Sequence, residues 1–366
     1  MKLLRVILLG MTSVFAHAAT VSHTSFGKLP DGSNVEQYTL KSEAIELKVI
    51  SFGARITGLT SKDRDGKVAD VVLGYNTLDE YVKNKEFYFG VVPGRYANRI
   101  AKGKFTLEGK PYQITLNDGV NTLHGGVEGF GHRNWTGKEI PGGVEFTLVS
   151  PDGDQGYPGT LTSHVKYTVS GATVKIEYSA TTDKVTVINL TNHAYFNLSG
   201  EGSASILDEK LMLDADKYTP VDSTLIPTGE LAPVAGTPFD FTHPTVIGSR
   251  INDANEQLKL GGGYDHNWVV RGTPGTLRPA AKVIDPASGR TMLVETTEPG
   301  IQFYAGNFMD GSVKGKAGKI YLKRGALCLE TQHFPDSPNE PKFPSTELKP
   351  GQTYHTVTTF TFGVEK

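Results

Sequence analysis

The stretch HVKYTVSGATVKIEY, residues 164–178, decides the predicted fold. Polar and apolar side chains alternate through 164–169 and again through 174–178, which is the two-residue period of strands with one buried face. Ser170 and Gly171 lie between the two runs, and a glycine at such a short connection is a hairpin signal. The stretch therefore predicts two antiparallel strands joined by a tight turn.

The same pattern recurs along the chain and predicts an all-β protein. Further strand-like runs around turns lie at 104–107 and 112–116, at 282–284 and 292–295, and, as a final strand, at 356–362. The 42 glycines and 20 prolines are spread throughout and separate many short strands, while 251–258 suggests a short helix. We predict one all-β domain over residues 20–366, a large antiparallel β-sandwich that curves enough to leave an open cleft.

The first 19 residues have the composition of a secretory signal peptide. Lys2 and Arg5 are basic, Val6 to Phe15 is largely apolar, and residues 16–18 form a small-residue cleavage pattern. The alternatives are an uncleaved anchor or an ordinary buried first element, but the apolar run is short for a bilayer span. We predict that residues 1–19 are removed and that the mature protein is soluble, either periplasmic or secreted, without a membrane-spanning segment.

The composition excludes several classes of partner. Hydrophobic residues make up 38% of the chain and charged residues 21%, as in globular proteins. The formal net charge is −2 and no stripe of lysine and arginine stands out, which argues against nucleic acid and anionic membranes as partners. Cys328 is the single cysteine and lies in an apolar run, so we expect a small buried hydrophobe rather than a nucleophile.

Polar residues suited to chemistry concentrate in short runs that lie far apart in the sequence. Asn189 to Leu198 carries His193 among amide and hydroxyl side chains, and an imidazole so placed can donate or accept a proton near pH 7. The other runs are Gly94 to Ile100, Asn121 to Gly126, Tyr264 to Asn267, Gly300 to Phe303 and Cys328 to His333. These runs are the candidate site segments.

Each candidate also has an ordinary structural interpretation. Asn98 and Arg99 could pair with acidic neighbours at the surface, and His124 could cap a turn before two glycines. Glu330 could be the first exposed residue after an apolar strand, and Asp265 could be a turn aspartate.

Metal and cofactor motifs are missing from the sequence. There is no His-Glu-x-x-His, no Cys-x-x-Cys, no Gly-x-Ser-x-Gly, no Walker loop and no dinucleotide fingerprint. A metal triad of His124, His193 and Glu330, brought together by the fold, is the one metal site left open. We expect no metal and no cofactor.

Taken in order, the polar runs resemble those of the aldose 1-epimerases, also called galactose mutarotases. The matching segments are 94–100, 121–126, 191–198, 264–267, Gln302 and 329–332, with similar pieces at 151–153, 156–159, 225–229 and 306–308. The resemblance covers nearly all of the chain after the N-terminal segment. It implies a β-sandwich of the galactose mutarotase type that binds a free aldose in an open cleft and interconverts its α and β anomers without a cofactor.

The resemblance implies three catalytic residues. Glu330 is expected to be the general base, His193 the general acid, and His124 a second histidine close to the anomeric centre. Ring opening takes a proton from the C1 hydroxyl and gives one to the ring oxygen, so Glu330 should start ionised and His193 protonated. The nearby carboxylate should help to keep the imidazole charged.

The resemblance also implies four residues that position the sugar: Asn98, Arg99, Asp265 and Gln302. Charge-assisted hydrogen bonds from such groups to hydroxyls are strong and directional. A bound sugar also favours an aromatic platform, which Phe303 or Tyr157 could supply. After Gly129-Phe130 the chain continues Gly131-His132-Arg133, whereas family members often have an acidic residue and a lysine, so contacts from this loop differ.

Two other functions compete with the epimerase. One is a catalytically silent carbohydrate-binding protein on the same scaffold, which would not need an acid and a base. The other is an epimerase of phosphorylated hexoses, which would need a cationic phosphate pocket that Arg95 and Arg99 alone do not provide. We expect an exported monomer or weak homodimer that equilibrates sugar anomers before uptake.

Overall fold

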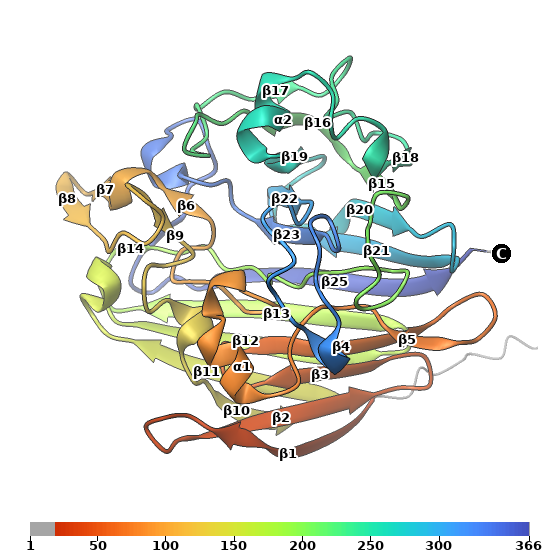
Figure 1. The fold of residues 1–366 in the computed structure, drawn as a ribbon. Helices are drawn as coiled ribbons and strands as arrows, with labels where there is room; N and C mark the ends of the chain where they lie inside the picture. The colour runs from red at the N-terminus through yellow and green to blue at the C-terminus, as the bar shows by residue number, and fades with distance from the viewer. Residues whose placement is uncertain (1–18, 366) are drawn as a thin grey trace, which may run out of the picture.

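The computed structural model describes residues 19–365, so the predicted signal segment, Ala19 excepted, lies outside the described residues (Figure 1). Strands dominate the chain and form three larger antiparallel sheets, which confirms the predicted all-β class. The first sheet is a simple meander in the order β1-β2-β3-β4-β5. Its strands are Thr20–Lys28, Asn34–Lys41, Glu46–Ile50, Arg55–Lys62 and Val68–Asp70.

The second sheet has nine strands in the order β10-β11-β12-β13-β25-β21-β20-β15-β18. In that order the strands are Thr136–Ile140, Gly143–Ser150, Leu161–Ser170, Thr173–Thr182, Tyr354–Val364, Arg290–Thr296, Arg278–Ile284, Lys210–Leu213 and Thr245–Val246. The C-terminal strand β25 lies between β13 and β21, so it joins the early and late halves of the chain.

The third sheet, here called the site sheet, has the order β17-β16-β19-β22-β23. Its strands are Ala232–Pro233, Ala215–Thr219, Asp265–Val270, Gly300–Tyr304 and Cys328–Gln332. Three two-stranded ribbons complete the strands: β6-β9 (Arg99–Ile100, Thr122–Leu123), β7-β8 (Lys104–Leu107, Lys110–Gln113) and β14-β24 (Thr186–Val187, Glu347–Leu348).

Helical segments are short. The α-helices are α1 (Leu78–Lys83) and α2 (Glu256–Gly261), and the 3-10 turns are Lys85–Phe87, Ala101–Gly103, Phe130–His132, Asp154–Gly156, Ile247–Ser249, Lys316–Gly318 and Ser337–Asn339. No helix in the region 19–365 has the length and apolar character needed to cross a bilayer.

The predicted hairpin is present and longer than its alternating core. Strands β12 and β13 pair from Ser170 and Thr173 at the turn to Leu161 and Thr182 at the far end. Their side chains alternate between buried and half-buried, because one face packs on the core. The other predicted hairpins and the final strand are also confirmed.

The helix predictions were less accurate. The sequence predicted a helix over 251–258, whereas helix α2 spans Glu256–Gly261. The side chain of Asn255 accepts the N–H groups of Gln257 and Leu258 and so sets the start of the helix. Helix α1 was not predicted, although Thr77 and Glu80 form a capping box that the sequence displays.

One large apolar cluster holds the sheets together. It takes Leu47 and Ile56 from the first sheet, Val165 from the nine-stranded sheet, and Trp268 and Phe303 from the site sheet. In Figure 1 the first two sheets form the layers of a sandwich, and the site sheet lies above them. The back of the site sheet is thus fixed to the core, and its front is left for polar side chains.

Candidate active site

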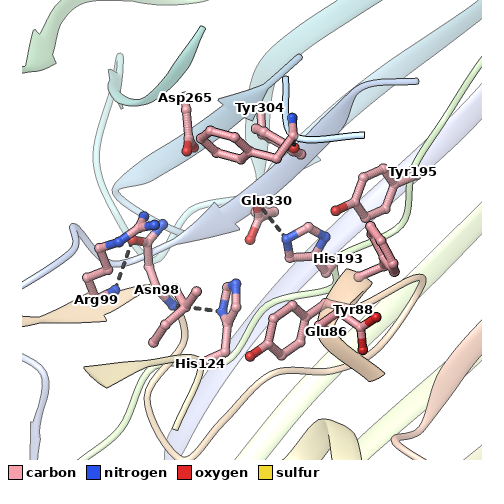
Figure 2. Close-up of a pocket in the computed structure, with 13 residues that line it drawn as sticks. Glu86, Tyr88, Asn98, Arg99, His124, His193, Tyr195, Asp265, Tyr304 and Glu330 are labelled. Carbon is pink, nitrogen blue, oxygen red and sulfur yellow. Dashed lines mark hydrogen bonds and ion pairs between the residues drawn. The ribbon is translucent and has the colours of Figure 1, made fainter. Parts of the chain in front are cut away.

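A pocket of about 170 Å³ lies over one end of the site sheet (Figure 2). It is lined by Glu86, Phe87, Tyr88, Asn98, Arg99, Leu123, His124, His193, Tyr195, Asp265, Tyr304, Phe308 and Glu330. These residues come from runs that are distant in the sequence. Every predicted site residue except Gln302 is among them.

Strand β23 presents Glu330 to the pocket. Leu329 packs into the large core cluster, so the alternation of the strand turns Glu330 to the opposite face. Its Oε1 lies 3.7 Å from Nε2 of His193, and the Glu330 side chain is only 3% exposed. Its Oε2 is buried and accepts no hydrogen bond from any residue within 19–365. A buried carboxylate oxygen without a partner is costly, and a hydroxyl group in the pocket would satisfy it.

The loop that carries His193 is held by its backbone. The N–H of His193 donates to the carbonyl of Val91, and its carbonyl accepts the N–H of Gly90, both at 2.9 Å. The imidazole stacks on Tyr195 at 5.0 Å between centroids, and its Nδ1 lies 3.5 Å from the sulfur of Cys328. With the ring packed on this side, Nε2 is turned toward Glu330 (Figure 2).

His124 is locked in one tautomer. The backbone N–H of Asn98 donates to Nδ1 of His124 at 3.1 Å, so the proton of the neutral ring sits on Nε2. His124 has a left-handed backbone, and the next residue, Gly125, does too; a Cβ on Gly125 would lie 1.7 Å from the carbonyl oxygen of Gly94. The His-Gly-Gly sequence is therefore needed for this close approach, and Nε2–H of His124 is available as a donor.

The same tautomer bears on the metal triad left open above. Ligand atoms of His124, His193 and Glu330 lie within 4.8 Å of one another, which is the neighbourhood that a cation would need. A metal ligand must offer a lone pair, however, and Nε2 of His124 carries a proton while Nδ1 accepts from Asn98. The donor set does not fit a metal ion held by all three residues.

Arg99 is held in place by a residue that the sequence analysis missed. Its Nε donates to Oδ2 of Asp118 at 2.8 Å, and its backbone N–H donates to Oδ1 of Asn98 at 2.9 Å. The Arg99 side chain is 11% exposed and borders the pocket. Asp118 lies in a turn outside all the polar runs, so no sequence pattern connected it with Arg99.

Gln302 lies on the same face of the site sheet as Glu330 and Asp265, but it is buried and does not line the pocket. Its Nε2 donates to Oδ1 of Asp265 at 2.7 Å, and it stands opposite Glu330 in the register of β22 and β23. Its Oε1 is buried and accepts no hydrogen bond from the residues within 19–365, and the expectation that Gln302 touches the sugar stays a prediction. Its contacts place it between Asp265 and Glu330, two residues that do border the pocket.

Burial dominates the ionisation of the pocket. It lowers the pKa of His193 to about 4, and it raises the pKa of Glu330 well above its usual value, with a smaller contribution from Asp265. Burial also raises the pKa of Asp265. The pKa of His124 falls well below 6.5 because of burial and the neighbouring His193 and Arg99.

These shifts correct one expectation from the sequence. Glu330 was expected to help keep His193 protonated, but burial lowers the pKa of His193 to about 4 and raises the pKa of Glu330. Burial therefore favours a neutral His193 and a protonated Glu330.

The aromatic residues of the pocket differ from those predicted. Phe303 is packed in the large core cluster, and Tyr157 is buried in a small cluster around Phe105, so neither reaches the pocket. Tyr304 and Phe308 line the pocket instead, stacked at 5.8 Å with 22° between their planes. Phe308 is 57% exposed, so part of its ring is accessible at the pocket.

Two other predictions concern buried residues. Cys328 is fully buried, and burial raises the pKa of its thiol well above the usual value, which agrees with a packing role and not a nucleophilic one.

Arg95 is also buried, and its guanidinium donates to the carbonyls of Pro158 and Gly159. It supports a loop and does not reach the pocket.

Comparison with known proteins gives consistent matches. The family model described as aldose 1-epimerase matches residues 36–361. The galactose mutarotase of Sus scrofa is 47% identical over 346 residues, which cover 94% of this chain and 99% of that protein. The aldose 1-epimerase of Escherichia coli K12 is 37% identical over 341 residues, which cover 92% of this chain and 97% of that protein.

Solved structures are similar over nearly the same span. An aldose epimerase homologue from C. elegans has 34% identity and a TM-score of 0.82, with 89% of this chain and 97% of that chain covered. A galactose 1-epimerase from Lactobacillus acidophilus has 27% identity and a TM-score of 0.83, with 95% of this chain and 100% of that chain covered.

Proposed function

The chain belongs to the aldose 1-epimerase family and is a mutarotase, and from this premise we propose that Glu330 is its general base and His193 its general acid. The observation that supports these roles is the approach of Oε1 of Glu330 to Nε2 of His193 at 3.7 Å in the wall of one pocket. A base and an acid so close together can act on adjacent oxygens of a single pyranose.

The reaction needs two proton transfers. Glu330 takes the proton of the C1 hydroxyl, the bond between C1 and the ring oxygen breaks, and His193 gives a proton to the ring oxygen. The product is the open-chain aldehyde. Rotation about C1–C2 presents the other face of the carbonyl. As the ring closes, His193 takes the proton of the C5 hydroxyl and Glu330 returns its proton to the C1 oxygen. No electron is gained or lost, so the step needs no redox partner.

The bound sugar sets the required protonation state. The cost of burying charge favours a protonated Glu330 and a neutral His193. The C1 hydroxyl donating to Glu330 favours the carboxylate, and the ring oxygen accepting from Nε2 of His193 favours the imidazolium. Substrate binding therefore moves the shared proton to His193 before the ring opens.

The remaining polar residues hold the sugar. Nε2–H of His124 is a fixed donor beside His193, with 5.1 Å between the ring centroids, and it points to the same region of the pocket. Arg99 and Asp265 bind hydroxyl groups farther from C1, and Asn98 joins them at the wall. Gln302 contributes through Asp265, whose carboxylate it fixes.

Phe308 and Tyr304 form the aromatic platform. Phe308 is exposed at the pocket and stacks on Tyr304, so one ring face supports the other and leaves an apolar surface for C–H groups of a sugar. This arrangement explains why so large an apolar ring is tolerated in contact with water.

Free aldoses are the substrate class that the pocket favours, as opposed to sugar phosphates. Three carboxyl groups line the pocket, from Glu86, Asp265 and Glu330, and the guanidinium of Arg99 is already paired with Asp118. A phosphate would meet more acidic groups than cations there. Galactose, which appears in the names of the relatives, and glucose are the hexoses to test first.

Export and assembly complete the proposal. The basic and apolar composition of residues 1–19 supports secretion or release into a periplasm, where the enzyme would equilibrate sugar anomers before uptake. The protein is proposed to act as a monomer or weak homodimer, since Glu330, His193 and His124 meet in the pocket of one chain.

Polarimetry on freshly dissolved α-D-galactose and α-D-glucose tests the function directly. The purified protein is expected to bring the optical rotation to equilibrium much faster than buffer alone. Glucose 6-phosphate should be a poorer substrate than glucose. Calorimetric binding of galactose without faster mutarotation would favour the silent carbohydrate-binding alternative, and equilibration at the rate of buffer for every aldose would reject the proposal.

A further inference from the structure

We propose that Asn189 is a positioning residue that fixes the base, the acid and the sugar-binding arm relative to one another. Its side chain is fully buried and makes three hydrogen bonds. Nδ2 donates to the carbonyl of Ala97 at 3.1 Å and to the carbonyl of His333 at 3.2 Å, and Oδ1 accepts the N–H of His333 at 3.0 Å. One amide thus joins three segments of the chain, its own and the two that carry Ala97 and His333.

Each of these segments carries a residue of the pocket. Ala97 directly precedes Asn98 and Arg99, His333 follows shortly after Glu330, and Asn189 itself begins the loop that carries His193. The three segments have no sequence proximity, so their relative placement depends on tertiary contacts. Asn189 is the point at which all three are joined by one side chain.

The backbone of Asn189 strengthens the same link. Its N–H donates to the carbonyl of Arg95 at 3.2 Å, and its carbonyl accepts the N–H of Ala97 at 2.8 Å. Tyr96 and Asn189 form an isolated parallel bridge. The amide side chain therefore extends an existing contact with the 95–97 segment across to His333, which the backbone of Asn189 does not reach.

A second set of buried polar contacts connects His333 to the loop that Asn189 begins. Nδ1 of His333 lies 2.6 Å from Oε2 of Glu298, and the hydroxyl of Tyr354 donates to Oε1 of Glu298 at 3.1 Å. The N–H of Leu190 donates to the Tyr354 hydroxyl at 3.2 Å, which closes the ring beside Asn189. Since the His333 side chain has this second anchor, loss of the Asn189 amide should shift the loop without unfolding it.

The geometry predicts a catalytic effect that exceeds the structural one. Proton transfer requires heavy-atom approach within about 3.2 Å, and a displacement of about 1 Å can cost about a hundredfold in rate. Asn189 ties together the segments that carry Glu330 and His193, so its loss should shift the two groups relative to each other and act mainly on kcat. Arg99 keeps its own anchor at Asp118, so KM should change less.

Asn197 provides a matched control in the same loop. It is also fully buried, its Nδ2 donates to the carbonyls of Gly325 and Ser203, and its Oδ1 accepts the N–H of Ser199. The number and kind of its side-chain hydrogen bonds equal those of Asn189. None of its partners belongs to the pocket or directly adjoins a residue of the pocket.

The experiment compares Asn189→Ala and Asn189→Asp with Asn197→Ala and Asn197→Asp in the full-length protein. Melting temperature is measured by circular dichroism, and kcat and KM are measured by polarimetry well below the melting transition. Asn189→Asp is nearly isosteric and keeps the acceptor for His333, so it tests the loss of the two donated bonds if the alanine variant does not fold.

At a similar loss of melting temperature, the Asn189 variants should lose about tenfold to a hundredfold in kcat with KM changed less than about threefold. The Asn197 variants should keep kcat within about threefold of the wild type. Equal kcat losses at the two positions, or a change in KM alone, would overturn the proposal. The proposal rests on the proposed function: an inactive wild-type protein would reject both, whereas an active wild type with equal losses at the two positions would reject this proposal alone.

Discussion

Nε2 of His193 and Oε1 of Glu330 lie 3.7 Å apart, although the two residues come from a loop and from an edge strand of a different part of the chain. Neither residue is held by the other. His193 is fixed by backbone hydrogen bonds to Gly90 and Val91, and Glu330 is fixed by the register of β22 and β23. The pair is therefore preorganised, and a pyranose entering the pocket meets both groups in place.

Replacing Glu330 by Gln should remove the base and leave the fold intact. The amide has nearly the same shape but cannot accept the C1 proton, so we expect kcat to fall by about 10² to 10⁴. Polarimetry on galactose measures the loss. Glu209→Gln is the matched control, because Glu209 is also a buried glutamate but lies outside the pocket. A Glu330→Gln variant with wild-type turnover would remove Glu330 from the role of base.

The pH profile of kcat/KM should be bell-shaped with an unusually low acid limb. Catalysis needs one proton shared by Glu330 and His193. His193, with a pKa of about 4, takes up a second proton only below that pH, so activity should fall there and not near 6.5. The alkaline limb marks loss of the shared proton from Glu330, whose pKa burial raises well above 4.5.

This profile is measured by polarimetry with the acid- and base-catalysed background subtracted at each pH. An acid limb centred near 6.5 would show that His193 titrates as an exposed histidine. In that case the attraction of Glu330, and not the cost of burial, controls the acid.

The sequence predicted the strands and the convergence of His193 and Glu330 because both depend on local patterns. Alternation identified β12 and β13, and the run around His193 and the block 329–332 resembled a known family. Asp118 and Tyr88 were missed because their roles come only from tertiary contacts: Asp118 pairs with Arg99, and the Tyr88 ring lies 4.7 Å from the ring of His124. Contacts of this kind have no sequence period.

The contacts of Gln302 could not be predicted from the sequence either. Its place in a matched run was clear, but a run does not specify which neighbours the side chain contacts. The register of three strands places Gln302 between Asn267 and Glu330, and its amide reaches Asp265. The prediction of Phe303 as an aromatic platform was wrong for a similar reason. Strand alternation turns Phe303 into the core and leaves Tyr304 at the pocket.

Asp118→Asn should weaken sugar binding more than catalysis. The variant loses the carboxylate that holds Nε of Arg99, and a hydrogen bond between charged groups is worth about 1.5–3 kcal/mol. We expect KM to rise by about tenfold, the equivalent of 1.4 kcal/mol, with kcat nearly unchanged. Initial rates over a range of galactose concentrations separate the two parameters. A fall in kcat with KM unchanged would place Arg99 in the chemical step instead.

Phe308→Ala should raise KM with little effect on stability. Aromatic stacking contributes about 0.5–1.5 kcal/mol, so a rise in KM of about threefold to tenfold is expected. Phe308 is 57% exposed, and its removal costs little core packing. Leu277→Ala, at an exposed apolar residue outside the pocket, is the control. If both variants bind galactose as the wild type does, Phe308 is not the platform.

Glu209 should make the folded state less stable as pH rises. Burial raises its pKa to about 8, whereas the unfolded chain titrates near 4.5. Between these values the folded protein keeps a proton that the unfolded chain releases, so the free energy of unfolding should fall by up to about 1.4 kcal/mol per pH unit. Below 4.5 both states are protonated, and the full contribution is present.

The variant Glu209→Gln tests this prediction. It keeps an acceptor for the N–H of Leu198, which donates to Oε1 of Glu209 at 2.7 Å, but it cannot ionise. Urea unfolding of both proteins at pH 5, 6, 7 and 8 measures the difference, because all other titrating groups are shared. The stability of the variant relative to the wild type should increase steadily across this window. A difference that is constant with pH would mean that Glu209 ionises at its ordinary pKa within the fold.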